Sequence, residues 1–107
     1  HALHGFFDAL RAEHEKDNIH VSLICPGYIK TKISFNALMG DGSKQNTMDK
    51  AQDNGMSPVI CASKIIRAIE QNKNEVYIGG FKEVAGIYLK RFFPNLFAKV
   101  VIKMAVT

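Results

Sequence analysis

One short segment of the chain combines residue types that could hold a ligand against bare backbone. It runs Ile24-Cys25-Pro26-Gly27-Tyr28-Ile29-Lys30-Thr31. Glycine allows a ligand to approach the backbone closely, proline fixes the turn, and a threonine four residues after the glycine adds a hydroxyl that donates and accepts hydrogen bonds. Ligands of open α/β sheets bind beyond the carboxyl ends of strands, where such a turn would lie. Taken alone, the pattern also fits an ordinary turn that ends a strand.

The histidines and cysteines lack the spacing of a metal site. His1 and His4 stand one helical turn apart, and His14 and His20 follow without supplying a further ligand in register, which tetrahedral zinc requires. We therefore predict no metal ligands, and histidines that are exposed or face a dimer partner. The two cysteines have apolar neighbours and form no CxxC motif, so we expect buried thiols in a reducing compartment.

The hydrophobic pattern predicts the elements that must position the Pro-Gly segment. Apolar residues recur at three- and four-residue spacing near the start, which predicts a helix over residues 1–17. Residues 19–25 alternate and then become wholly apolar, as a strand in a covered sheet does. Ser57-Pro58 is a good helix start, with serine as N-cap and proline at the first helical position. That helix carries an apolar stripe, namely Val59, Ala62, Ile65, Ile66 and Ile69.

The remaining elements are a strand over residues 75–79 and helices around residues 84–93 and 96–105, separated by Pro94. Two strands joined through a helix imply parallel pairing, and a two-stranded parallel sheet cannot stand alone. The first helix also begins without an N-cap residue or an initiator methionine. We therefore expect the chain to be part of a longer protein that supplies the other strands.

The excess positive charge lies at the end of the chain. The net charge is +4, yet residues 1–80 are balanced, and the surplus comes from residues 81–107, where a single acid, Glu83, opposes Lys82, Lys90, Arg91, Lys99 and Lys103. These bases alternate with apolar residues, which favours a partner or membrane surface over nucleic acid, since nucleic-acid binding would need a basic stripe on a folded face. No apolar run reaches the ~18 residues of a spanning helix.

The first third of the chain resembles the short-chain dehydrogenase/reductase family. In that family the active-site Tyr-x-x-x-Lys motif precedes a helix of the kind Ala-Leu-x-Gly-Phe-x-x-x-Leu-Arg-x-Glu. This chain has Ala2-Leu3-His4-Gly5-Phe6-Phe7-Asp8-Ala9-Leu10-Arg11-Ala12-Glu13, and then Pro26, Gly27 and Thr31 match the family's Pro-Gly-x-x-x-Thr. The likeness extends over nearly the whole chain, and its later part is similar to the member-seven subgroup and to bacterial reductases.

The resemblance implies an α/β fold. The chain would be the C-terminal part of a Rossmann-type doubly wound parallel sheet, ending in amphipathic helices, and residues 1–107 would be the C-terminal half of one domain. Backbone groups of Pro26, Gly27 and Ile29 would hold the nicotinamide ring and carboxamide of NADP or NAD, and the Thr31 hydroxyl would bond the carboxamide or a phosphate. Tyr28 would line the substrate pocket or pack on the loop; both alternatives stay open.

The resemblance also places the catalytic tyrosine and lysine just upstream of His1, so no residue of the chain is expected to be catalytic. The complete protein would transfer hydride between NAD(P) and a carbonyl or alcohol, and this chain alone would be inactive.

Residues 32–56 would form the lid over the substrate. Their Met, Leu, Ile and Phe side chains suggest a lipophilic small molecule, or simply pack the lid onto the body. Gly40-Asp41-Gly42-Ser43 lacks the later Glu of a calcium loop and is expected to be a surface turn.

Interaction surfaces can be assigned to the two ends of the chain. The apolar arc of the helix at 1–17 would pack in the core, form a homo-oligomer, or do both. The tail at 81–107 would contact a membrane surface, cross a neighbouring subunit or dock on its own enzyme. A cytoplasmic or membrane-associated protein is expected. The alternative function is a non-enzymatic membrane- or protein-binding module that uses the basic amphipathic tail.

Overall fold

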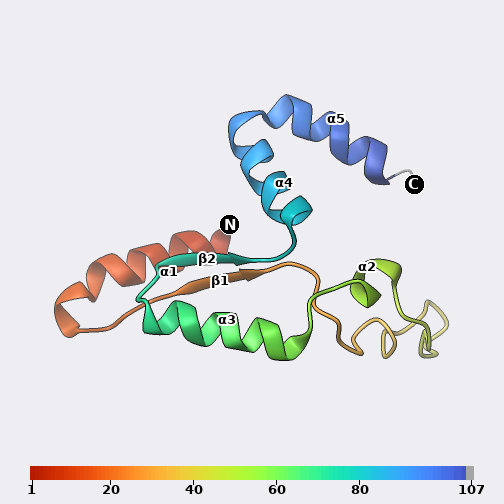
Figure 1. Cartoon of the computed structure of the whole chain (residues 1–107), viewed down its shortest axis with the longest axis horizontal. Coiled ribbons are helices and arrows are strands. Elements are labelled where there is room, and N and C mark those ends of the chain that lie inside the picture. Colours follow the sequence, from red (N-terminus) through yellow and green to blue (C-terminus); the bar gives the residue numbers. More distant parts are fainter. Residues whose placement is uncertain (106–107) are drawn as a thin grey trace.

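The fold is a short parallel sheet flanked by helices, with a helical pair projecting from it. A computed structural model describes residues 1–105, without the side chains of residues 51, 52 and 105. Residues 106 and 107 of the predicted tail therefore lie outside the described part. The elements in order are α1 (Ala2–Glu13), η1 (Glu15–Asp17), β1 (Leu23–Pro26), α2 (Lys50–Asp53), α3 (Pro58–Glu70), β2 (Glu75–Ile78), α4 (Phe81–Phe92) and α5 (Pro94–Ala105) (Figure 1).

The two strands pair in parallel, as expected for strands joined through a helix. The register runs from Leu23 opposite Glu75 to Pro26 opposite Ile78. Side chains alternate between the faces of a strand, so the face that carries Cys25 and Glu75 meets His4 of α1. The opposite face carries the buried Ile78 and is covered by α3. The result is a three-layer helix–sheet–helix arrangement.

The first strand is shorter than its sequence pattern predicts, which corrects the expectation of a strand over residues 19–25. It begins at Leu23 because β2 begins only at Glu75, so the preceding residues have no partner strand. Their polar groups bond elsewhere: the Val21 carbonyl accepts from the Arg11 guanidinium, and the Ser22 hydroxyl donates to the Lys73 carbonyl at 2.7 Å. The residues before Leu23 therefore have the sequence pattern of a strand but no partner strand to pair with.

Helix α3 begins where the sequence indicates, with Ser57 as N-cap and Pro58 as its first residue. The Ser57 side chain makes no capping bond; its carbonyl accepts from Cys61 N–H at 3.0 Å. The buried residues of this helix are Cys61 and Ala68, whereas Val59 is 78% exposed and Ile66 and Ile69 are more than half exposed. Most of the apolar stripe therefore faces away from the sheet.

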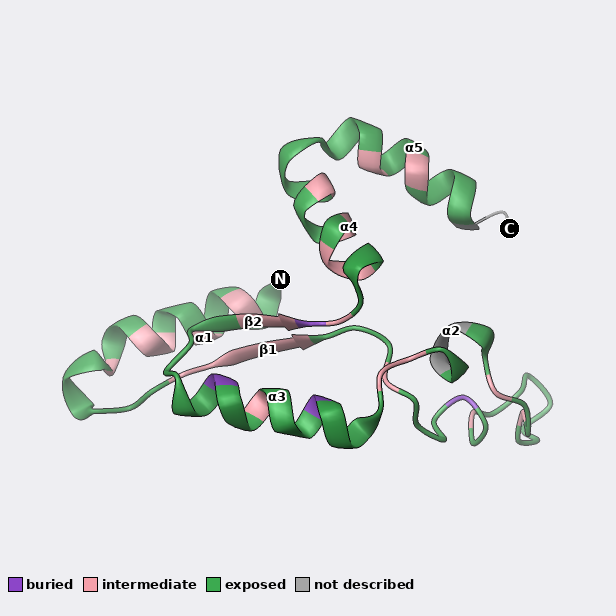
Figure 2. Cartoon of the chain, viewed as in Figure 1, coloured by how far each residue is buried: buried purple, intermediate pink, exposed green. Residues whose placement is uncertain are grey.

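The described residues do not enclose a core of ordinary size. The buried hydrophobic residues are Cys61, Ala68 and Ile78, and Figure 2 shows almost every other surface as exposed or intermediate. The accessible surface is 8764 Å², whereas a compact monomer of this mass exposes about 5,900 Å². The radius of gyration is 17.1 Å, against about 13 Å for a compact domain of this length. Many large apolar side chains of the described residues are therefore exposed.

Helices α4 and α5 pack against each other and project from the carboxyl end of β2 (Figure 1). Both lie close to where the sequence predicts them, and Pro94 is the first residue of α5. Among residues 1–105, no helix has the length and apolar character to cross a bilayer.

Candidate functional site

The Pro-Gly segment lies where the sequence places it, at the carboxyl ends of both strands. Pro26 ends β1, and the Gly27 N–H donates to the Ile78 carbonyl at 2.7 Å. A hollow of about 290 Å³ is lined by Pro26, Gly27, Tyr28 and Glu83. Carboxyl ends of parallel strands are where open α/β sheets bind ligands, so this hollow is the candidate site.

Two backbone groups of the loop, the Ile29 N–H and the Pro26 carbonyl, point away from the segments that pair with the loop. Met56 N–H donates to the Tyr28 carbonyl at 2.9 Å, and Lys30 N–H donates to the Met56 carbonyl at 2.8 Å. Ile29 lies between Tyr28 and Lys30, so its N–H and carbonyl point away from Met56. The Ile29 N–H has no hydrogen-bond partner among residues 1–105. The N–H groups of Leu23 and Gly27 both face β2, so by alternation the Pro26 carbonyl faces the edge of β1 that no described strand covers.

This pair of groups fits a primary carboxamide. A carboxamide oxygen accepts one hydrogen bond and its amino group donates another. The Ile29 N–H is a donor and the Pro26 carbonyl an acceptor, three residues apart in the chain. The residues present therefore fit the carboxamide end of a nicotinamide cofactor.

Glu83 is a functional candidate that the sequence interpretation did not single out. Its carboxylate accepts from Tyr28 N–H at 3.2 Å and from Gly80 N–H at 2.7 Å, which joins the Pro-Gly loop to the start of α4. A Cβ at Gly27 or at Gly79 would overlap this carboxylate. Glu83 is the third residue of α4, and glutamate at that position is a known signal for a helix N-terminus. The signal locates a cap but does not show that the cap reaches the loop.

The side chains of Thr31 and Tyr28 make few contacts in the loop. The Thr31 hydroxyl oxygen accepts from Ile33 N–H at 3.4 Å, so the side chain forms a local turn and its own O–H hydrogen stays available. Tyr28 is 55% exposed and lines the hollow. The structure brings Pro26, Gly27 and Tyr28 to the hollow, while Thr31 lies further along the loop.

Residues 32–56 form an irregular segment, as their lack of periodicity predicts. Ser34 is buried in it: its hydroxyl donates to the Met48 sulfur at 3.3 Å and accepts from Asp49 N–H at 3.2 Å. Lys30 and Asp53 form an ion pair of 3.0 Å at its base.

The predicted surface turn over residues 40–43 is present. Asp41 accepts from the N–H and the hydroxyl of Ser43, and these hydrogen bonds lower the pKa of the Asp41 carboxyl.

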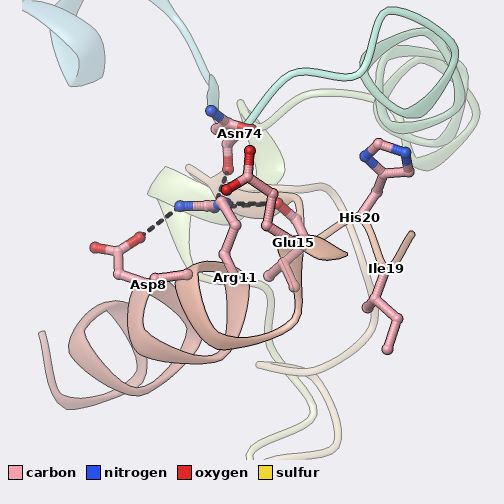
Figure 3. A pocket seen from close by; sticks show the side chains of 8 residues that line it. Asp8, Arg11, Glu15, Ile19, His20 and Asn74 are labelled. Carbon is pink, nitrogen blue, oxygen red and sulfur yellow. Dashed lines mark hydrogen bonds and ion pairs between the residues drawn. The ribbon is translucent and has the colours of Figure 1, made fainter. Parts of the chain in front are cut away.

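A hollow larger than the one at the Pro-Gly loop lies at the opposite end of the sheet. It has a volume of about 390 Å³, and its lining includes Asp8, Arg11, His20 and Asn74 (Figure 3). Arg11 donates to the Val21 carbonyl at 3.0 and 3.2 Å and to the Asn74 carbonyl at 2.9 Å. Because these residues precede the amino ends of β1 and β2, the hollow is on the wrong side of the sheet for the expected ligand. Arg11 holds α1 against the chain segments that enter the strands.

A polar cluster that the sequence spacing does not reveal lies under α1. His4 Nε2 is 3.0 Å from a Glu75 carboxylate oxygen and 3.5 Å from the Cys25 sulfur, and the Tyr77 hydroxyl donates to the same Glu75 oxygen at 2.8 Å. Cys25 is therefore half-buried among polar groups rather than fully buried as expected, whereas Cys61 is buried. Burial, followed by the Glu75 charge, raises the pKa of the Cys25 thiol.

The chain is similar to curated relatives over nearly its whole length. It is 39% identical over 105 residues to "Dehydrogenase/reductase SDR family member 7B" of Danio rerio, covering 98% of this chain and 34% of that protein. It is 41% identical over 105 residues to "Dehydrogenase/reductase SDR family protein 7-like" of Anopheles gambiae, covering 98% and 33%. The Bos taurus member 7B protein is 40% identical over 105 residues, covering 98% and 32%.

The chain spans about a third of the length of these relatives. No family model and no solved structure matches it.

Proposed function

This chain belongs to the short-chain dehydrogenase/reductase family, as a homologue of the C-terminal portion of its member-7 proteins, and we propose that it supplies the nicotinamide-holding part of an NAD(P)-dependent oxidoreductase. The complete protein, meaning the polypeptide that its full coding sequence specifies, transfers hydride between the cofactor and a carbonyl or alcohol in this proposal. The two described strands are then part of a larger Rossmann-type sheet.

The observation that carries the proposal is the backbone of the Pro-Gly loop. Near the carboxyl ends of the strands, the Ile29 N–H points away from Met56, and the Pro26 carbonyl points away from β2. A carboxamide held between them fixes the rotation of the nicotinamide ring, which decides the face that exchanges hydride. Thr31 would add a hydroxyl contact to the carboxamide or a phosphate.

The cofactor supplies the hydride; the chain's own residues orient it and help to exclude water. The family's tyrosine and lysine stand just before the position of His1, so the chain alone is proposed to be inactive. Its open structure agrees, because so little apolar surface is buried among the described residues. The exposed side chains of Leu3 and Phe6 on α1 support the proposed homo-oligomer contact.

A lipophilic substrate is the finer part of the proposal. Residues 32–56 follow the Pro-Gly loop, and their apolar side chains Ile33, Phe35, Leu38 and Met39 are exposed. A lid closing over the hollow would turn such side chains toward the substrate. Met and other apolar residues suit an adaptable apolar pocket.

Cofactor binding and turnover test this function. We would titrate NADPH and NADH into the complete protein and into the 107-residue chain, and then assay both with lipophilic ketones and with small hydroxy acids. The complete protein should bind one of the cofactors and reduce the ketones, and the chain alone should not turn over. Lack of cofactor binding by the complete protein would exclude the proposal, and a preference for small hydroxy acids would exclude only the lipophilic substrate.

The projecting helical pair favours a second function, binding to a membrane surface. Helices α4 and α5 expose Phe81, Phe92, Phe93, Ile102 and Met104 next to basic residues. Phe81 is 89% exposed. An amphipathic helix with these two kinds of residue binds an anionic bilayer through apolar burial and charge attraction. This surface could anchor the proposed enzyme or act without enzymatic activity.

Vesicle sedimentation tests this second function. The complete protein should bind vesicles that contain anionic lipid, and the binding should weaken with added salt because the basic residues contribute to it. Replacing Lys99 and Lys103 by glutamine should reduce binding, whereas Lys64→Gln, a change on α3, should not. Equal binding by all variants would show that the tail does not face the membrane.

A further inference from the structure

Three side chains from three different elements meet under α1. His4 comes from the first turns of α1, Cys25 from β1 and Glu75 from β2. One nitrogen, one sulfur and one oxygen of these residues all lie within 4.8 Å of one another. None of the three is within twenty residues of another in the sequence, so no spacing motif could reveal the cluster. It lies outside the hollow that the cofactor proposal uses.

The two separations measured from the His4 nitrogen are close to the ligand–ligand distances of a tetrahedral metal site. Zinc binds imidazole nitrogen and carboxylate oxygen at about 2.0–2.2 Å and thiolate sulfur at about 2.3 Å. Tetrahedral angles then place nitrogen and sulfur about 3.5 Å apart and nitrogen and oxygen about 3.3 Å apart. The observed separations are 3.5 Å between His4 Nε2 and Cys25 Sγ and 3.0 Å between His4 Nε2 and Glu75 Oε1. Both separations from the His4 nitrogen therefore match these edges to within a few tenths of an ångström, and the Cys25 sulfur lies within 4.8 Å of a Glu75 carboxylate oxygen.

The type of donor selects the ion. Thiolate and imidazole together favour zinc over magnesium or calcium, which prefer oxygen ligands. Three protein ligands leave a fourth tetrahedral position for water. We propose that His4, Cys25 and Glu75 form a zinc site that fastens α1 to both strands.

A supporting contact holds one ligand in place. The Tyr77 hydroxyl donates to the Glu75 oxygen at 2.8 Å, from the same strand and the same face as Glu75. Hydrogen bonds of this kind orient carboxylate ligands and contribute to metal affinity. This hydrogen bond also raises the pKa of the Tyr77 hydroxyl, so the tyrosine stays a donor over the working pH range.

Zinc binding at this site should release a proton. Burial and the Glu75 charge raise the pKa of the Cys25 thiol. The other titratable groups that face the sulfur are His4 and Tyr77. Only the thiolate is a zinc ligand, so zinc binding displaces the thiol proton to solvent.

Cobalt spectroscopy tests the site directly. We would titrate Co²⁺ into the metal-free complete protein and record sulfur-to-cobalt charge transfer and tetrahedral ligand-field bands. The expected result is one Co²⁺ per chain with both bands, displaced by Zn²⁺. Cys25→Ser should remove the charge-transfer band, and Cys61→Ser should leave it unchanged because Cys61 lies on α3, on the other side of the sheet.

A milder variant keeps the test informative if Cys25→Ser disturbs folding. Tyr77→Phe removes only the hydroxyl and should weaken zinc binding about tenfold, whereas Tyr88→Phe on α4 should not change it. Competition with a chelator of known affinity measures both. Absence of the sulfur band, or equal zinc affinity in Tyr77→Phe and the unchanged protein, would overturn the proposal.

Discussion

The carboxylate of Glu83 occupies the space that a side chain at Gly27 would need. The same carboxylate fills the space beside Gly79, and it accepts hydrogen bonds from the loop and from the first turn of α4. The sequence pattern assigns Gly27 to the close approach of a ligand. The structure adds a second reason for glycine: the Pro-Gly loop, the end of β2 and the start of α4 meet around one acidic side chain.

Gly27→Ala should therefore be destabilising through Glu83. The new methyl group would displace the carboxylate, at a cost of about 1–3 kcal/mol for overpacking. Glu83→Ala alone should cost about 1 kcal/mol by removing the cap. In the double variant the methyl group has no carboxylate to displace, so its total cost should be smaller than the sum. Urea unfolding of the four proteins measures this coupling.

Gly5→Ala is the matched control for that cycle. Gly5 lies inside α1, and a Cβ there has no neighbouring atom within 4 Å. The change should stabilise the protein by about 0.5–1 kcal/mol, because alanine is the better helix former. Strictly additive effects of the Gly27 and Glu83 changes would contradict the shared space.

Arg11 should be the residue of α1 that contributes most to holding this helix on the sheet. Arg11→Met keeps the apolar length but removes the hydrogen bonds to the Val21 and Asn74 carbonyls. A loss of about 2–3 kcal/mol is expected, since hydrogen bonds to charged groups contribute more than neutral ones. Asp8→Asn should cost less than about 1 kcal/mol because its ion pair with Arg11 is exposed. Similar losses in the two variants would show that the ion pair, not the carbonyl contacts, matters.

The pH dependence of Cys25 alkylation should report the raised pKa of its thiol. In a Cys61→Ser background with a chelator present, the iodoacetamide rate should increase only above the pH at which an ordinary thiol ionises. Glu75→Gln should shift the profile to lower pH by removing the second cause, while burial, the larger cause, remains. An unshifted profile would contradict the role of Glu75.

The raised pKa of the Cys25 thiol also predicts how the free energy of unfolding changes with pH. The folded-state pKa of Cys25 is higher than the unfolded one, so folding favours the protonated thiol. This contribution is fully present below the ordinary thiol pKa and is lost as the pH rises through the folded-state value. Unfolding free energies measured across alkaline pH should therefore fall more steeply in the unchanged protein than in Cys25→Ser.

Local pattern predicts the elements well here, because capping and periodicity depend on neighbouring residues. Ser57-Pro58 locates the start of α3, and Pro26-Gly27 locates the end of β1. Features that depend on distant residues were not predictable in the same way. The beginning of β1 depends on where β2 starts, and the cluster of His4, Cys25 and Glu75 depends on the parallel register. The exposure of the α3 stripe was not predictable either, because it depends on which face of the helix meets the sheet.

Thr31 provides the sharpest test of the cofactor site among the side chains. Its hydroxyl oxygen accepts one long hydrogen bond from Ile33 N–H, so the O–H hydrogen can be donated to a carboxamide or phosphate oxygen. Thr31→Val keeps the shape and removes the hydroxyl. The Kd for NADPH or NADH should increase about five- to tenfold in the complete protein, which corresponds to one hydrogen bond of about 1–1.4 kcal/mol.

Thr47→Val is the control for that measurement, because Thr47 is exposed in the same irregular segment and lines no hollow at the loop. It should leave the Kd unchanged, and unfolding curves should show that both variants are equally stable. A Kd that increases only for Thr31→Val would place the cofactor against the loop that Pro26 begins. An equal Kd in both variants would mean that the cofactor is held by the Ile29 N–H and the Pro26 carbonyl without Thr31, and the residue would then serve only the local turn with Ile33.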